Sequence, residues 1–275
     1  MVNITKLLVC VLIILFSILA NNASNHEPSW DQIELLGIDT NLSYAHPILM
    51  KYSNPSSYDI FYGQNSGAVI HQSNIAASTT RFVFEESEIG LSSDLYNRSA
   101  PYGFDINSDG NTDILIGDEA GNIHLYLQFD GRFEKDTSTF ADIKVDSFSK
   151  VTMATIDDDE FFDIVVGTGR GELVVFLNKG SSTNPSWERN DEIFGDILVN
   201  GHASPFAIDP NGDGGYDFVV GSERGGLTYL KNLGINSATG FPDFEEISFT
   251  NSGNPFSTIE FSDNEFLTPF IIDLR

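Results

Sequence analysis

The sequence predicts an all-β protein, a β-propeller of four-stranded blades with about four to five blades present. Two observations predict this fold. An acidic loop recurs along the chain, and a short apolar strand segment follows each copy. The copies recur at steps of 50 to 54 residues, which is typical of an array of small supersecondary units. A solenoid of β-meanders is the alternative architecture.

The copies of the loop align on a closing Asp. Aligned in this way, they span residues 51–59, 105–113, 155–163 and 209–217, with a partial copy at 273–275. Outside the N-terminal apolar run, no stretch shows helical periodicity over ten residues. The repeats therefore cover residues 28–275 as one propeller domain.

Each repeat offers four strand segments: one before the loop, one after it, one after a Gly-containing turn, and one that carries an aromatic residue. The second segment is continuously apolar, as in 114–116, which is typical of a strand buried on both faces. The third alternates in part, as in 172–176, which indicates one wetter face. The aromatic residues of the fourth segment are Phe84, Phe133, Trp187 and Phe244.

The two ends of the chain show the same pattern. Residues 28–31 (Pro-Ser-Trp-Asp) match residues 185–188 (Pro-Ser-Trp-Glu), so we expect Trp30 to lie on an outer strand of a blade shared with the far end of the chain. Residues 269–273 resemble residues 205–209, which precede a loop. We therefore expect the chain to be a truncated part of a longer protein.

The N-terminus reads as a secretory signal peptide over residues 1–20, with cleavage after Ala20 or Ala23. Its apolar run, residues 7–19, is short for a membrane span, and an uncleaved anchor is the alternative. We expect a secreted protein with no membrane insertion within this chain, or a cell-surface protein if an anchor follows it. Glycosylation sequons begin at Asn22, Asn41 and Asn97.

The net charge and the cysteine content of the chain limit its possible partners and its means of stabilisation. The formal net charge is −26, which repels phosphate backbones and anionic lipids, so nucleic acid is not an expected partner. The single cysteine, Cys10, lies in the predicted signal, so the mature chain has no disulfide. Secreted proteins often need such cross-links, and bound metal is the natural substitute.

The acidic loops predict Ca²⁺ sites. Oxygen ligands at loop positions 1, 3, 5, 7 and 9, with Gly at position 6, form a Ca²⁺ cage. The complete sets are Asp105, Asn107, Asp109, Asn111 and Asp113 in one loop, and Asp209, Asn211, Asp213, Gly215 and Asp217 in another, with position 7 acting through its carbonyl. Strand residues rather than Glu occupy position 12, which argues against an EF-hand.

The other two loops are less complete. The loop at 155–163 begins with Thr155 but keeps Asp157, Asp159 and Asp163, so metal binding there stays open. The loop at 51–59 has Lys51 and Ser53 at ligand positions and is expected to be a metal-free turn, in which Lys51 could supply the positive charge.

Catalysis is not predicted. No histidine has metal-ligand spacing to another, there is no Gly-x-Ser-x-Gly motif, and Ca²⁺ binding accounts for the paired Asp residues. A propeller-type polysaccharide lyase or hydrolase is the enzymatic alternative. It would need His, Tyr, Arg or carboxylate side chains gathered at the central channel.

The chain resembles the FG-GAP and VCBS-type repeat family, best known from the N-terminal propellers of integrin alpha chains. The resemblance rests on residues 105–117, 171–188, 209–221 and 226–245 and covers nearly all of residues 28–275. It implies a propeller with Ca²⁺ in loops between inner strands. The expected function is binding, adhesion or scaffolding for an extracellular protein or glycan. The alternative is the repeat region of a larger surface receptor.

Overall fold

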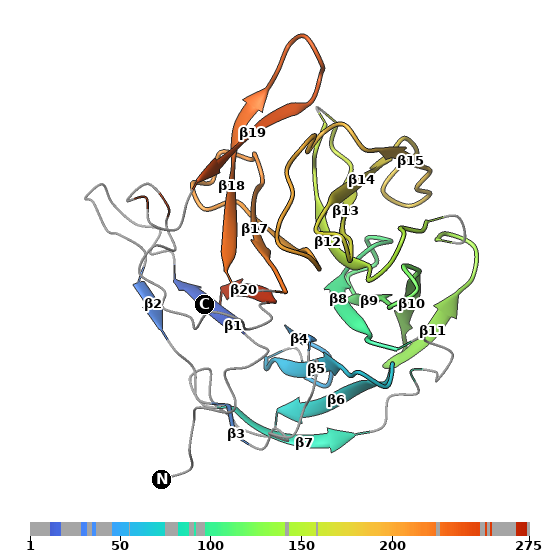
Figure 1. Cartoon of the computed structure of the whole chain (residues 1–275). Helices are drawn as coiled ribbons and strands as arrows, with labels where there is room; N and C mark the ends of the chain where they lie inside the picture. The colour runs from blue at the N-terminus through green and yellow to red at the C-terminus, as the bar shows by residue number, and fades with distance from the viewer. Residues whose placement is uncertain are drawn as a thin grey trace.

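The computed structural model describes residues 12–17, 29–31, 35–36, 46–54, 56–74, 82–87, 91, 97–140, 143–157, 159–223, 226–247, 251, 254 and 268–273. These residues form strands and loops and contain no helix. Four antiparallel four-stranded sheets are arranged around a common centre as the blades of a β-propeller (Figure 1). The predicted fold class is confirmed.

Each blade follows the predicted order of four strands, from the centre of the ring to its edge. The first blade holds β4 (His46–Met50), β5 (Asp59–Gly63), β6 (Val69–Asn74) and β7 (Phe82–Ser87). The second holds β8 (Ala100–Phe104), β9 (Asp113–Gly117), β10 (Ile123–Phe129) and β11 (Arg132–Asp136). The third holds β12 (Lys150–Ala154), β13 (Asp163–Gly167), β14 (Leu173–Asn178) and β15 (Trp187–Asn190). The fourth holds β16 (Ser204–Ile208), β17 (Asp217–Gly221), β18 (Leu227–Ile235) and β19 (Pro242–Ile247).

A three-stranded sheet takes the remaining place in the ring. It contains β20 (Pro269–Asp273), β1 (Leu12–Ser17) and β2 (Ser29–Asp31), and β20 contacts both β16 and β4 (Figure 1). The strand of Trp30 is the outer strand of this sheet, but it pairs with β1 and joins β20 only through β1. A short strand, β3 (Leu35–Leu36), extends the first blade beside β7.

Strand β1 lies inside the predicted signal peptide and pairs in parallel with β20. The rest of that segment, including Ala20 and Ala23, and the sequons at Asn22 and Asn41 lie outside the described residues. So does most of the partial loop at 273–275, of which only Asp273 is described.

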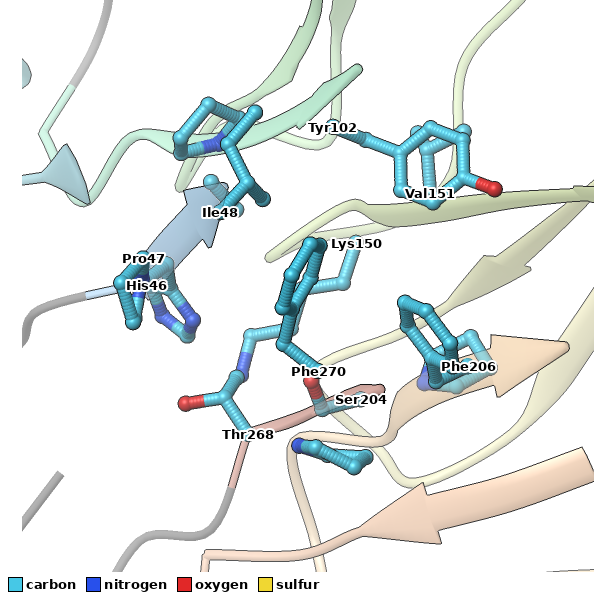
Figure 2. A pocket seen from close by; sticks show the side chains of 14 residues that line it. His46, Pro47, Ile48, Tyr102, Lys150, Val151, Ser204, Phe206, Thr268 and Phe270 are labelled. Atoms are coloured by element: carbon cyan, nitrogen blue, oxygen red, sulfur yellow. The ribbon is translucent and has the colours of Figure 1, made fainter. Parts of the chain in front are cut away.

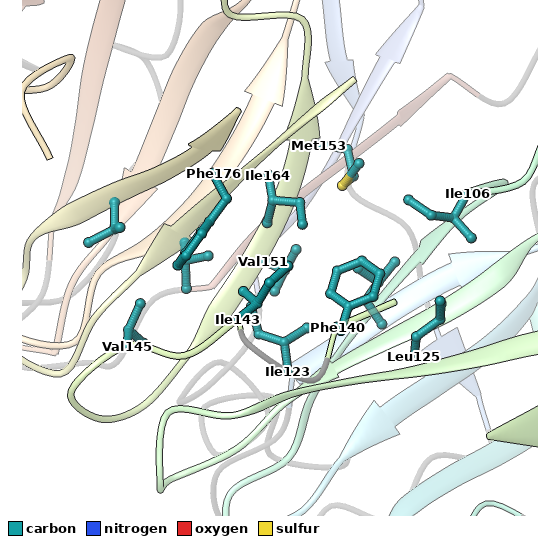
Figure 3. Close-up of a cluster of buried hydrophobic side chains, with 13 residues drawn as sticks. Ile106, Ile123, Leu125, Phe140, Ile143, Val145, Val151, Met153, Ile164 and Phe176 are labelled. Atoms are coloured by element: carbon teal, nitrogen blue, oxygen red, sulfur yellow. The ribbon is translucent and has the colours of Figure 1, made fainter. Parts of the chain in front are cut away.

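The cores lie between neighbouring blades, which explains the continuously apolar second strands. Leu115 of β9 packs towards the third blade, whereas Ile114 and Ile116 pack towards the first, and all three are fully buried. Figure 3 shows the cluster between the second and third blades, which includes Leu125 of β10 and Val151 of β12. One expectation is wrong: β14 has no wetter face, because both of its faces are covered by neighbouring blades and all six residues are buried.

The Gly that ends the second strand in each of the first three blades has a packing reason. A β-carbon at Gly117 would lie 1.9 Å from the carbonyl oxygen of Ser149, which directly precedes the inner strand of the next blade. The same contact recurs at Gly63 with Ser99 and at Gly167 with Ala203. Only a residue without a side chain lets neighbouring blades approach this closely.

Candidate metal loops

The loops at 105–113 and 209–217 share one backbone conformation. At position 4, Ser108 and Gly212 have φ values of +58° and +71°, and at position 6, Gly110 and Gly214 have +89° and +87°. Glycine adopts this left-handed region without strain, which explains Gly at position 6 in both loops. The two loops predicted to be complete therefore make the same sharp turn.

The carboxylate at position 1 holds this turn in both loops. Asp105 accepts the N–H groups of Asp109 (3.1 Å) and Gly110 (2.9 Å). Asp209 accepts those of Asp213 (3.2 Å) and Gly214 (3.0 Å). The position 1 carboxylate thus lies inside the curve of its own loop, towards positions 5 and 6.

The carboxylate at position 5 organises the second half of each loop. Asp109 accepts the N–H of Asn111 (2.8 Å), and Asp213 accepts the N–H of Gly215 (2.8 Å). The amides at position 3 also take part, because Asn107 donates to Asp109 (3.1 Å) and Asn211 donates to Asp213 (2.8 Å). Positions 1, 3 and 5 are therefore drawn together around one exposed turn in both loops.

The closing Asp links its loop to the rest of the blade. Asp113 accepts the N–H of Ile106 (3.1 Å) within the loop and the N–H of Gln128 (2.7 Å) on β10. Asp163 accepts the equivalent N–H groups of Ile156 and Asn178, both at 2.8 Å. Each carboxylate oxygen keeps a further lone pair, so this role does not remove the Asp as a metal ligand.

In the fourth blade, a different donor replaces the position 2 N–H that donates to the closing Asp in the second and third blades. Pro210 occupies position 2 of its loop and has no N–H to donate. There the hydroxyl of Tyr229 donates to Asp217, while the N–H of Asn232 donates to its other oxygen (2.7 Å). Tyr229 was missed by the sequence analysis. Its signal is Pro210, which removes a loop N–H that the closing Asp would accept, so that a donor is needed elsewhere; Tyr229, twelve residues after Asp217 on β18, supplies it.

The loop at 155–163 differs in its charge balance. The ammonium group of Lys179, on the turn after β14, donates to Asp157. This hydrogen bond, with the charges of Asp157, Asp159 and Asp163, raises the pKa of Lys179. Lys179 was also missed by the sequence analysis, although it follows Asn178, whose N–H contacts the closing Asp.

The loop at 51–59 brings few oxygens together. Its buried carboxylate, Asp59, accepts the N–H of Ser53 (2.8 Å) and lies 3.1 Å from Nε2 of the buried His71. The ammonium of Lys51 lies over the ring of Tyr58, 5.2 Å from its centroid. The positive charge of Lys51 is thus directed towards an aromatic face.

The residues of the two complete loops fit a divalent cation by their chemistry. Each ligand position can offer an oxygen, from a carboxylate, an amide or a backbone carbonyl, which is the donor type that Ca²⁺ prefers. Burial foremost, and the charges of Asp109 and Asp105, raise the pKa of Asp113 to about 6, although its hydrogen bonds oppose this. A cation beside these carboxylates would offset that repulsion.

The carboxylates alone do not form a metal-binding cluster. In the part of the chain that the structure describes, no group of three or more His, Cys, Asp or Glu side chains is arranged to hold a metal ion. Any Ca²⁺ site in these loops must therefore draw on amide and backbone oxygens as well as on carboxylates, as the predicted ligand sets do.

A second feature lies at the centre of the propeller. A cavity of about 40 Å³ is lined by the starts of the inner strands, among them His46, Lys150, Ser204 and Thr268 (Figure 2). Burial, with the charge of Lys150, lowers the pKa of His46 well below 6.5. The cavity has room for only one to a few water molecules and is far smaller than the ~300–1,000 Å³ of ligand pockets.

A larger hollow of about 490 Å³ lies between the loops of the third and fourth blades. Its lining includes Asp157, Asp159, Asp213, Asn232 and Ile235. The hollow is thus beside a complete loop, and carboxylates contribute much of its wall.

A comparison with models of known protein families gives no match, and a comparison with curated proteins gives none either. Among the described residues there is no helix of the length and hydropathy needed to cross a membrane.

Proposed function

We propose that this protein is a secreted, Ca²⁺-stabilised β-propeller of the FG-GAP/VCBS type that binds or scaffolds an extracellular protein or glycan. The observation that carries the proposal is the shared geometry of the loops at 105–113 and 209–217. Both loops turn through left-handed residues at positions 4 and 6 and gather the oxygens of positions 1, 3 and 5. The same oxygen-rich arrangement, repeated in two blades, supports metal binding.

In this proposal Ca²⁺ has a structural role. It would neutralise the loop carboxylates and tie together residues that already link the inner strands through the closing Asp. The ligands would be Asp105, Asn107, Asp109, Asn111 and Asp113 in one blade, and Asp209, Asn211, Asp213, Gly215 and Asp217 in the other. The loop residues themselves fix the turn through their hydrogen bonds to backbone N–H groups.

The proposed partner binds beside the loops rather than at the ring centre. The central cavity is too small for a sugar ring, whereas the hollow between the third and fourth blades is large enough for one. Exposed apolar side chains also occur near these loops, at Phe162 and Ile235. A mixed polar and apolar surface of this kind suits a protein or glycan ligand.

The experiment is thermal unfolding in Ca²⁺ and in chelator. Extracellular modules bind Ca²⁺ with a Kd of ~10⁻⁴–10⁻³ M. At roughly millimolar Ca²⁺, mass action then stabilises the fold by on the order of 0.5–1.5 kcal/mol per site. Two sites should raise the melting temperature by several degrees.

Variants locate the effect. Asp109→Ala and Asp213→Ala should each remove about half of the Ca²⁺-dependent increment, because each deletes a charged ligand. Asp196→Ala, which removes an exposed carboxylate outside the loops, is the matched control and should leave the increment intact. If the wild type does not respond to Ca²⁺, or the double variant responds as strongly as the wild type, the loops are acidic turns and the proposal fails.

Secretion is tested separately. The N-terminal sequence of protein collected from the medium should begin after Ala20 or Ala23. A protein that keeps residues 12–17, the residues of β1, would instead be an uncleaved form and would contradict the predicted signal peptide.

A further inference from the structure

We propose that Lys179 is the resident cation of the loop at 155–163, so that the third blade is stabilised without metal. This inference deepens the proposed function and rests on it for the contrast with the two complete loops. It assigns different sources of positive charge to neighbouring blades: a lysine side chain in one, and Ca²⁺ in the blades on either side.

The first observation is the position of Lys179 in the repeat. It lies sixteen residues after the closing Asp163, directly after Asn178, whose N–H donates to that Asp. The equivalent residues in the neighbouring blades are Phe129 and Leu233, which follow Gln128 and Asn232. The same position in the repeat is thus filled in all three blades, and only the third blade has a cationic residue there.

The second observation is the contact itself. The Nζ of Lys179 donates to Oδ2 of Asp157, whose side chain is only 10% exposed. By contrast, Phe129 and Leu233 are 69% and 57% exposed. These two apolar side chains carry no charge that could neutralise the carboxylates of their own loops.

The third observation is the loop backbone. Glu160 stands at position 6, where Gly110 and Gly214 turn through the left-handed region. No described residue of the loop at 155–163 has a positive φ, and Thr155 replaces the Asp at position 1. The loop therefore lacks the left-handed residue at position 6 and one of the charged ligands of the complete loops, while the ammonium group of Lys179 reaches it.

The fourth observation is the packing of this loop. Phe162 at position 8 contacts Phe104 of the second blade, with ring centroids 4.7 Å apart, and lies near Tyr216 of the fourth blade at 6.4 Å. Tyr216 stands at position 8 of its own loop, so this aromatic contact joins residues of the second, third and fourth blades. Phe162 thus packs the end of the loop at 155–163 against both neighbouring blades.

The test is a double-mutant cycle in which the melting temperature of each variant is measured in the presence of a chelator. Lys179→Met keeps the length of the side chain and removes its charge, and it should lower the melting temperature by roughly 2–4 °C. Lys179→Arg keeps the charge, so its melting temperature should fall by less than that of Lys179→Met. The double variant Asp157→Asn/Lys179→Met should recover part of the loss, because the unpaired carboxylate is gone. Lys144→Met, an exposed lysine outside the loops, controls for the change in net charge.

Ca²⁺ counting completes the test. Equilibrium dialysis should give the same number of bound Ca²⁺ ions for the wild type and Asp159→Asn, because this loop holds none. Loss of one ion in Asp159→Asn would overturn the inference, as would a Lys179→Met variant that is as stable as the wild type in chelator. If the wild type binds no Ca²⁺ at all, the proposed function fails, but the cycle in chelator still decides the role of Lys179.

Discussion

Replacement of Gly117 by alanine should weaken the contact between the second and third blades. Gly117 ends β9, and a β-carbon there would lie 1.9 Å from the carbonyl oxygen of Ser149 and 2.7 Å from its carbonyl carbon. Ordinary contact begins near 3.4 Å, so the backbone at Ser149 would have to retreat by about 1.5 Å. The two nearest clashing atoms belong to the backbone, so no rotation of a side chain can relieve the clash.

The magnitude follows from the hydrogen bonds at this contact. The N–H of Ser149 donates to the carbonyl of Asp118 (3.1 Å), and the N–H of Asp118 donates to Oγ of Ser149 (3.0 Å). A retreat of this size would stretch both beyond hydrogen-bonding distance. At about 1 kcal/mol for each bond and ~1–3 kcal/mol for overpacking, the free energy of unfolding should fall by about 3–5 kcal/mol.

The assay is urea unfolding at a fixed Ca²⁺ concentration, with Gly103→Ala as the matched control. Gly103 lies on β8, next to β9, and a β-carbon there would meet side-chain atoms of Thr112 at 3.2 Å and Met50 at 3.3 Å, which can move. Neither glycine has a positive φ, so backbone strain does not separate them. The control should lose less than about 1 kcal/mol. A Gly117→Ala loss no larger than the Gly103→Ala loss would refute the close approach of the two blades.

Two further predictions concern buried polar groups. Tyr229→Phe removes the hydroxyl that replaces the missing N–H of Pro210 as a donor to Asp217. The free energy of unfolding, measured by chemical denaturation, should therefore fall by about 1.5–3 kcal/mol. An unchanged denaturation midpoint would contradict this role of the hydroxyl. Burial and Lys150 hold the pKa of His46 below 6.5, so the fold keeps it neutral while the unfolded chain binds a proton as pH falls below about 6.5. Stability should therefore fall with decreasing pH, and His46→Gln should flatten this dependence by up to about 1.4 kcal/mol per pH unit; parallel pH profiles for the two proteins would contradict it.

Much of the architecture could be predicted because it depends on local patterns. The continuously apolar segment at 114–116 and the aromatic at Trp187 repeat at blade spacing, and each pattern reflects the burial of a single strand. The turn of the complete loops could also be predicted from the sequence, because Gly110 and Gly214 mark the left-handed backbone that the turn needs. Residues close in sequence satisfy these requirements within one loop or one strand.

The site was predictable only in part, because several contacts join residues that lie on different strands. The sequence showed Asp113 and Asp163 as loop residues, but only the strand register brings the N–H groups of Gln128 and Asn178, fifteen residues further on, to their carboxylates. The same register places Lys179 beside Asp157.

The amino-acid sequence by itself determined the repeat, the order of strands in each blade and the residues of the acidic loops, because these follow from periodicity and backbone preference over a few residues. Only the tertiary structure decided that β20 lies between β16 and β4, that both faces of β14 are buried, and that a lysine enters one acidic loop. Those outcomes depend on how blades pack and on the register across a hairpin, where a shift of one residue would turn each side chain to the other face.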